Sequence, residues 1–233
     1  MSVVVVCKTT ARNRKEVLCM ADTFGIFRVQ KLSQGRAGGS LATSWKHQAR
    51  HDEVADISHP ERTHLNYTKV SPTCEGLTPS QIAKKILGKH QQATGRKYRS
   101  DGSVAVEMLF SHSPGADVNM KEFENRIFNF IKSEFPSMKL LRVDRHCDES
   151  SDHWHVIGTM TQNGRITIAK DLGGPAEFRK HQDRFAEFVA DLGLKRGIPK
   201  SKTGKRHRTK MQWEQQQKQD RETAQILHDI FER

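Results

Sequence analysis

The stretch that decides the fold is residues 140–168, LLRVDRHCDESSDHWHVIGTMTQNGRITI. It holds two strand-like segments, residues 140–145 and 153–160, and a third at 165–168. Asn163-Gly164, between the second and the third, is the pair that a type I′ turn prefers, because both of its residues accept a positive φ. The stretch therefore predicts consecutive antiparallel strands that end in a tight hairpin.

Three helices are expected around this stretch. Thr78-Pro79-Ser80-Gln81 is a capping box with proline at the first helical position, and it predicts a helix from residue 79 to about 87, ending near Gly88. Asn119 caps a second helix, whose apolar residues recur at 3.6-residue spacing. A third is expected over 175–192, with Gly193 as its C-terminal cap.

Further strands are expected from residue 24 onward and over 62–70 and 103–110. The predicted strands are more numerous than the strict alternation of strand and helix in a parallel sheet would give. The predicted fold class is therefore α+β: a central antiparallel sheet of about five strands with helices packed on it, plus a C-terminal polar helix.

The chain carries a large positive charge. It has 233 residues, with 39 Lys+Arg against 27 Asp+Glu, a formal net charge of +12 and a pI near 9.7. Such an excess favours a polyanionic partner, with nucleic acid ahead of a membrane surface. No apolar run approaches the roughly 20 residues of a membrane helix, so a cytoplasmic protein without a membrane segment is expected. Four scattered cysteines show no metal-ligand spacing and indicate a reducing compartment.

Composition suggests four parts. Residues 1–19 fit poorly onto the rest of the chain and are expected to be a leader, with Met20 as the natural start. Residues 20–194 form the main domain. Residues 195–210 are strongly basic, and 211–233 have a polar helical pattern.

Three histidines in the fold-deciding stretch predict a metal site. His153 and His155 lie two apart on a predicted strand, so their side chains leave the same face. His146 ends the neighbouring strand, and a tight turn can bring its imidazole alongside. Three neutral imidazoles leave coordination positions open for water or a phosphate oxygen, as a catalytic site requires. The alternative is that these histidines are merely solvated.

The residues leave the nucleophile open. An activated water would make the protein a nuclease, and an attacking side chain would make it a covalent strand-transfer enzyme.

Three blocks in this order resemble the histidine-hydrophobe-histidine relaxases of plasmid mobilisation, specifically the MobV class of Pre/Mob plasmid recombination proteins. The first runs from Gly38-Gly39 through the WKHQAR segment at 45–50 to the HLNY segment at 64–67. The second is the histidine cluster at 146–155. The third is GLKRG at 193–197, with basic residues after it to 209.

The resemblance implies a fold and a chemistry. Residues 20–194 would be the relaxase catalytic domain, which nicks single-stranded DNA at a plasmid transfer origin and keeps the 5′ phosphate on a histidine. By position that nucleophile is His47, with Arg50 supporting the phosphate and Glu149 near the cation or the nucleophile. His146, His153 and His155 would hold one Mn²⁺ or Mg²⁺. A neutral imidazole needs no deprotonation to attack phosphorus.

Family position and charge together indicate the DNA contacts. They are Lys46, Asn66, Tyr67, Lys195, Arg196, Lys200, Lys202, Lys205, Arg206 and Arg208. A solvated linker is the alternative for the basic residues after 195. Single-stranded or supercoiled plasmid DNA at a transfer origin is the expected partner, with conjugation machinery as a further class; the oligomeric state stays open.

One departure qualifies the resemblance. The family usually has proline before the second metal histidine, where this chain has Asp152. Asp152 would either lie close to the cation and alter its preference, or face solvent.

The competing functions are a rolling-circle replication initiator or transposase of the same fold, and a catalytically inactive origin-binding protein. No tyrosine occurs after Tyr98, which argues against the first.

Overall fold

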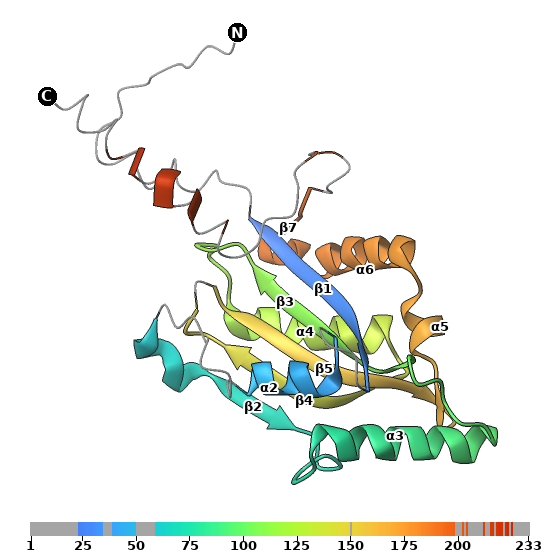
Figure 1. Cartoon of the computed structure of the whole chain (residues 1–233). Helices are drawn as coiled ribbons and strands as arrows, with labels where there is room; N and C mark the ends of the chain where they lie inside the picture. The colour runs from blue at the N-terminus through green and yellow to red at the C-terminus, as the bar shows by residue number, and fades with distance from the viewer. Residues whose placement is uncertain are drawn as a thin grey trace, which may run out of the picture. The chain divides into compact units, whose positions relative to one another are not determined.

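The computed structural model describes residues 23–34, 39–49, 59–149, 151–198 and scattered positions between 202 and 225. One sheet forms its centre (Figure 1). Its strand order is β2-β4-β5-β3-β1-β7, with β6 paired to β5. The strands are β1 (Phe24–Ser33), β2 (Tyr67–Val70), β3 (Ser103–His112), β4 (Met138–His146), β5 (His153–Gln162), β6 (Arg165–Ile166) and β7 (Lys195–Arg196). The five from β2 to β1 are antiparallel, as predicted, and the two-residue β7 adds a parallel edge.

Helices cover both faces of this sheet. They are α2 (Leu41–Gln48), α3 (Pro79–Thr94), α4 (Met120–Glu134), α5 (Ile168–Leu172) and α6 (Pro175–Phe188), with 3-10 turns η2 (Pro60–Leu65) and η3 (Ala190–Leu192). Beyond Gly197 a second compact unit begins, and its described residues between 212 and 225 are helical. In the described part of the chain, no helix is both long and apolar enough to span a bilayer.

Successive side chains of β5 point to opposite faces of the sheet and so enter two different hydrophobic cores. Trp154 belongs to an aromatic core with residues of α4 and α6, among them Phe123, Phe130 and Phe185. Ile157 belongs to the core on the opposite face, which α2 and α3 cover. Figure 1 shows α2 in front of the sheet and α4 behind it. Because side chains alternate along a strand, His155 shares the α2/α3 face with Ile157.

The predicted hairpin is confirmed. Asn163 and Gly164 both have positive φ, 49° and 78°, as a type I′ turn requires. The turn rests directly on α3. A Cβ on Gly164 would lie 2.9 Å from Cβ of Ala93, and the backbone N–H of Ile166 donates to Nδ1 of His90 at 3.1 Å.

This contact explains why α3 is longer than predicted. The helix passes Gly88 and ends at Gly95, which has a φ of 66°. A glycine in a helix interior costs only about 1 kcal/mol relative to alanine. Packing of the last two turns against the hairpin outweighs that cost.

Residues 62–70 are a second correction. They form the end of η2 and then β2, not one strand. Leu65 is 46% exposed and does not share the buried side of the sheet. Arg62 and Thr63 instead bind carboxylates of the turn between β4 and β5, which keeps this segment out of the sheet.

The hairpin contact predicts opposite effects of alanine at two glycines. Gly164→Ala should lower the free energy of unfolding by more than about 1 kcal/mol, since its φ is positive and the new methyl meets Ala93. Gly88→Ala should raise it by up to about 1 kcal/mol, because the methyl meets open space within a helix. Urea denaturation of both variants measures this; a stabilising Gly164→Ala would contradict the docking of the hairpin.

Candidate metal centre and nucleic-acid site

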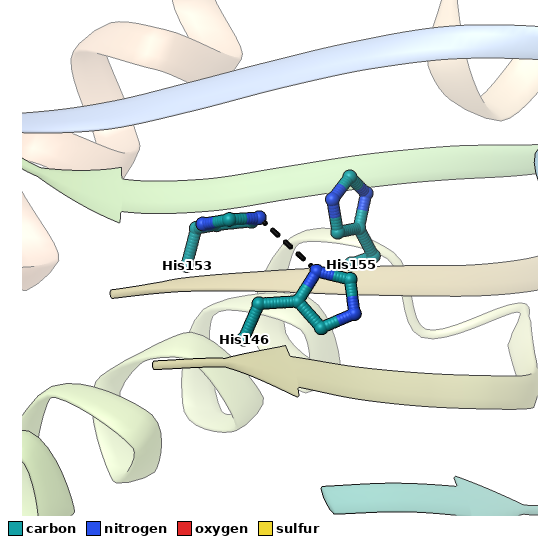
Figure 2. A group of neighbouring side chains, drawn as sticks. All are labelled: His146, His153 and His155. Carbon is teal, nitrogen blue, oxygen red and sulfur yellow. Dashed lines mark hydrogen bonds between the residues drawn. The ribbon is translucent and has the colours of Figure 1, made fainter. Parts of the chain in front are cut away.

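Three histidines converge where β4 ends and β5 begins. The register pairs His146 with His153, and His155 lies next on the same face of β5. One ring nitrogen from each lies within 4.8 Å of the others. Figure 2 shows the three imidazoles turned toward one another, with Nδ1 of His146 3.3 Å from Nε2 of His153. Their side chains are 6–12% exposed. The predicted cluster is therefore formed.

The partners of the outward ring nitrogens fit a metal site. Nδ1 of His155 lies 2.9 Å from Oε1 of Glu107, and Nδ1 of His153 lies 3.0 Å from the carbonyl oxygen of Ser151. Both partners are acceptors, so each Nδ1 carries the proton and each Nε2 keeps its lone pair. Metal-binding histidines are typically fixed in this way. The histidines can thus hold a divalent cation as neutral nitrogen ligands.

Glu149 lies at the edge of the histidine cluster. Its Oε1 is 3.8 Å from Nδ1 of His146 and 3.9 Å from Nε2 of His153. Its side chain is 22% exposed, so it lies between the buried histidines and solvent. A carboxylate here can attract a cation or accept a proton.

His47 reaches the same place from a distant part of the sequence. It lies in the last turn of α2 and is exposed. Its ring centroid is 6.0 Å from that of His155, with the rings nearly perpendicular. Both line a pocket of about 390 Å³, together with Arg28, Val29, Gln30, Glu107 and Leu109. The residue that the resemblance marked as the nucleophile thus lies beside the metal centre.

Glu107 was missed by the sequence analysis. It lies on β3 and accepts three side-chain hydrogen bonds: from His155, from Gln48 at 2.7 Å and from Gln30. Burial raises its pKa, but the hydrogen bonds that its carboxylate accepts, from His155 first, outweigh burial and lower the pKa to about 2. Glu107 therefore remains a carboxylate and joins α2 to a metal ligand. The sequence did carry a signal for it, because Glu107 is an acidic residue within the otherwise apolar run at 104–110.

Asn66, which was predicted to contact DNA, holds the turn behind the histidines. Its side chain accepts from the backbone N–H of Cys147 at 2.7 Å and donates to Asp148 at 2.8 Å. Asp148 is fully buried and also accepts from Thr63. The residue after His146 is thus fixed by the side chain of Asn66, which lies between η2 and β2.

Asp152 neither faces solvent nor is a member of the histidine cluster. It is 6% exposed. Its carboxylate binds Arg62 of η2, and Nη2 of Arg145 at 2.9 Å. Burial raises its pKa, but the hydrogen bonds from Arg145 and Arg62 outweigh burial and lower it. Asp152 therefore joins η2 to the end of β4, and its charge is neutralised by two arginines.

The remaining predicted DNA contacts have different surroundings. Lys46 is exposed beside His47. Tyr67 donates its hydroxyl hydrogen to Glu124 and packs on the aromatic core, and burial together with Glu124 raises its pKa. Lys195 is exposed on β7, whereas Arg196 binds Asp183 at 2.8 Å and Gln182 at 2.7 Å on α6.

Several predicted residues lie outside the described part of the chain. They are Arg50, Lys200, Lys205, Arg206 and Arg208, together with residues 1–19. Lys202 is described and exposed, within the second unit.

Comparison with known proteins adds sequence and fold relatives. The family model for the plasmid recombination enzyme (Mob_Pre) matches residues 21–215. Plasmid recombination enzyme type 3 of Staphylococcus aureus is 26% identical over 199 residues, covering 83% of this chain and 48% of that protein. A 65 kDa protein of Zymomonas mobilis is 26% identical over 188 residues, 77% of this chain and 30% of that protein. The chain thus spans about half, or less, of the length of these relatives.

Among solved structures, the fold is similar to the MobM relaxase domain (MOBV; Mob_Pre) in a Mn-bound crystal structure with plasmid pMV158 oriT DNA. The TM-score is 0.65 at 20% identity, covering 82% of this chain and 98% of that one. A second crystal structure of that domain, with oriT DNA carrying a 3′ thiophosphate, gives 0.64 at 20% identity and the same coverage. At this identity the likeness establishes a shared fold.

The contacts of Glu107 predict its effect on metal binding. Glu107→Gln should weaken Mn²⁺ binding by about 10- to 100-fold, because an amide cannot accept from His155, Gln48 and Gln30 together. Isothermal titration calorimetry with Mn²⁺ measures it. Glu122→Gln, the same change at an exposed position of α4, is the matched control and should bind Mn²⁺ like the wild type. Equal affinities of the two variants would contradict a supporting role for Glu107.

Proposed function

The chain belongs to the plasmid recombination enzyme family, as its three sequence blocks predicted, and on that basis we propose that it is a relaxase, which nicks one DNA strand at a plasmid transfer origin and rejoins it for mobilisation or recombination. The observation that supports the proposal is that His47 and His155 line one pocket, and His155 belongs to the cluster of three histidines that can hold a metal ion.

The pocket supplies the parts of a phosphoryl transfer. A divalent cation, Mn²⁺ or Mg²⁺, held by His146, His153 and His155 would polarise a non-bridging oxygen of the scissile phosphate. His47, which lines the same pocket as His155, is the attacking group. Because it lies in the exposed last turn of α2, its imidazole is open to a DNA strand that enters from solvent.

The proposed step exchanges one bond to phosphorus for another. A ring nitrogen of His47 attacks phosphorus; the N–P bond forms and the bond from phosphorus to the 3′ oxygen breaks. The 3′ oxygen takes up a proton from solvent water and leaves as a hydroxyl, and the proton on the other ring nitrogen of His47 passes to a carboxylate, for which Glu149 is the candidate. Attack of a 3′ hydroxyl on the histidine phosphate reverses the step and rejoins the strand.

Gln48 and Glu107 are positioning residues in this proposal. Gln48 is the neighbour of His47 on α2, and its amide binds Glu107, which in turn binds His155. The chain of hydrogen bonds fixes the nucleophile helix relative to the metal ligand. A phosphoryl transfer depends on such alignment, since small displacements of the attacking atom cost large factors in rate.

Replacement of His47 tests the nucleophile. Incubated with Mn²⁺ and a supercoiled plasmid that carries the DNA upstream of the gene, the wild type should form a covalent protein–DNA adduct and His47→Ala should form none. Denaturing gel electrophoresis detects the adduct. His64→Ala removes an exposed histidine of η2 and should behave as the wild type.

Two results would overturn this assignment. An adduct that persists in His47→Ala would place the nucleophile elsewhere, with Tyr67 the first to test. A wild type that binds the plasmid but never nicks it would favour the origin-binding protein, or a requirement for the further length that relatives have.

Metal removal is a separate prediction. Chelation by excess EDTA should abolish nicking, and added Mn²⁺ should restore it, because the cation is needed to polarise the phosphate. Binding of the plasmid in a mobility-shift assay should survive chelation, since phosphate contacts to lysine and arginine need no cation. Nicking that continues without a divalent cation would refute the metal-dependent mechanism.

A further inference from the structure

A second pocket lies at the other end of β5 from the metal centre. It has a volume of about 460 Å³ and is lined by Ala93, Gln162, Asn163, Arg165, Thr167 and Lys170. The pocket is formed where the β5–β6 hairpin rests on α3. Two cations and two amides line it and no carboxylate does, which is a composition that suits a phosphate group.

The charge continues along α3. Lys84, Lys85 and Lys89 are exposed, and residues 79–100 contain no aspartate or glutamate. Asp171, next to Lys170, is bound by the hydroxyls of Ser137 and Thr167. Within the described residues, none of the three α3 lysines, Arg165 or Lys170 has a carboxylate partner within 4.0 Å. This charge is therefore uncompensated by the fold.

Gly88 leaves one position of this surface without a side chain. It lies on the exposed side of α3, and a Cβ there would meet nothing within 4 Å. Packing inside the chain thus gives no reason for a glycine that weakens the helix. A helix face without a side chain does allow the backbone of a ligand to come close.

The surface lies within reach of DNA held at the metal centre. α3 covers the same face of the sheet on which His155 lies. Gln162 comes seven residues after His155 on β5, which corresponds to about 23 Å at ~3.3 Å per residue. That length equals roughly seven phosphates along one strand of B-form DNA at ~3.4 Å each.

We propose that α3 and the β5–β6 hairpin form a second DNA contact, the distal basic surface, made by Lys84, Lys85, Lys89, Arg165 and Lys170. It binds phosphates of the DNA that flanks the nick site, without reading bases. The inference rests on the proposed function, because it names a further contact to the same DNA.

Charge removal at two places tests it. The distal variant carries Lys89→Ala, Arg165→Ala and Lys170→Ala. The control variant carries Lys121→Ala, Arg179→Ala and Lys132→Ala, exposed cations of α4 and α6 on the opposite side of the sheet. Both lose two lysines and one arginine, so their net charges are equal. Because all six side chains are exposed, thermal denaturation should give the same midpoint for both variants.

The readout is the salt dependence of DNA binding. Fluorescence anisotropy measures binding to a labelled duplex of about 40 base pairs between about 50 and about 300 mM NaCl. The distal variant should bind at least tenfold more weakly than the wild type at low salt. Its slope of log K against log salt should be shallower by about 2.7, which is ~0.9 for each of three lost phosphate contacts. The control variant should keep the wild-type slope.

The outcomes separate the two proposals. Equal losses in both variants would show only a general charge effect and would overturn the distal basic surface, as would a distal variant that binds like the wild type. A wild type that binds no DNA under any salt condition would overturn the proposed function itself.

Discussion

The pairing register of β4 with β5 is the constraint on which the site depends. It sets His146 opposite His153 and leaves His155 on the same face. A slip of one residue would send β5 side chains to the wrong faces, placing His155 in the aromatic core and Trp154 in the pocket. Several interactions oppose such a slip: Trp154 is fully buried among aromatic residues, and Asn66, Asp148 and Asp152 tie the turn to η2 and the start of β2.

Buried carboxylates organise the face of the sheet that carries the site. Glu107 joins α2 to His155, and Asp144 binds Arg142 through two hydrogen bonds of 2.6 and 2.7 Å. Asp148 and Asp152 hold η2. Burying a charge is costly unless it is compensated; each of these acids accepts hydrogen bonds, and Asp144 and Asp152 also form ion pairs with arginines. The cost is tolerated because the same contacts fix the metal histidines and the helix that carries His47 in one geometry.

The distribution of charge complements this arrangement. Glu107 and Asp144 on the α2/α3 face are buried, whereas the lysines of α2 and α3 are exposed. In the proposed function, a DNA strand would meet positive charge on its way to the pocket that His47, His155 and Glu107 help to line. Such a field guides a polyanion toward the site and leaves the chemistry to groups held rigidly beneath it.

The sequence alone determined the features that depend on local chemistry. Asn163-Gly164 specified the turn, Asn119 specified the start of α4, and the spacing of His146, His153 and His155 specified a shared face, because turn geometry, capping and strand alternation act over a few residues. The family blocks marked His47, but only the tertiary structure brought it within 6.0 Å of His155. Tertiary structure also decided the role of Glu107, the partners of Asp152, the length of α3 and the shape of residues 62–70. Each of these depends on atoms supplied by distant segments, and no local pattern encodes which segments will meet.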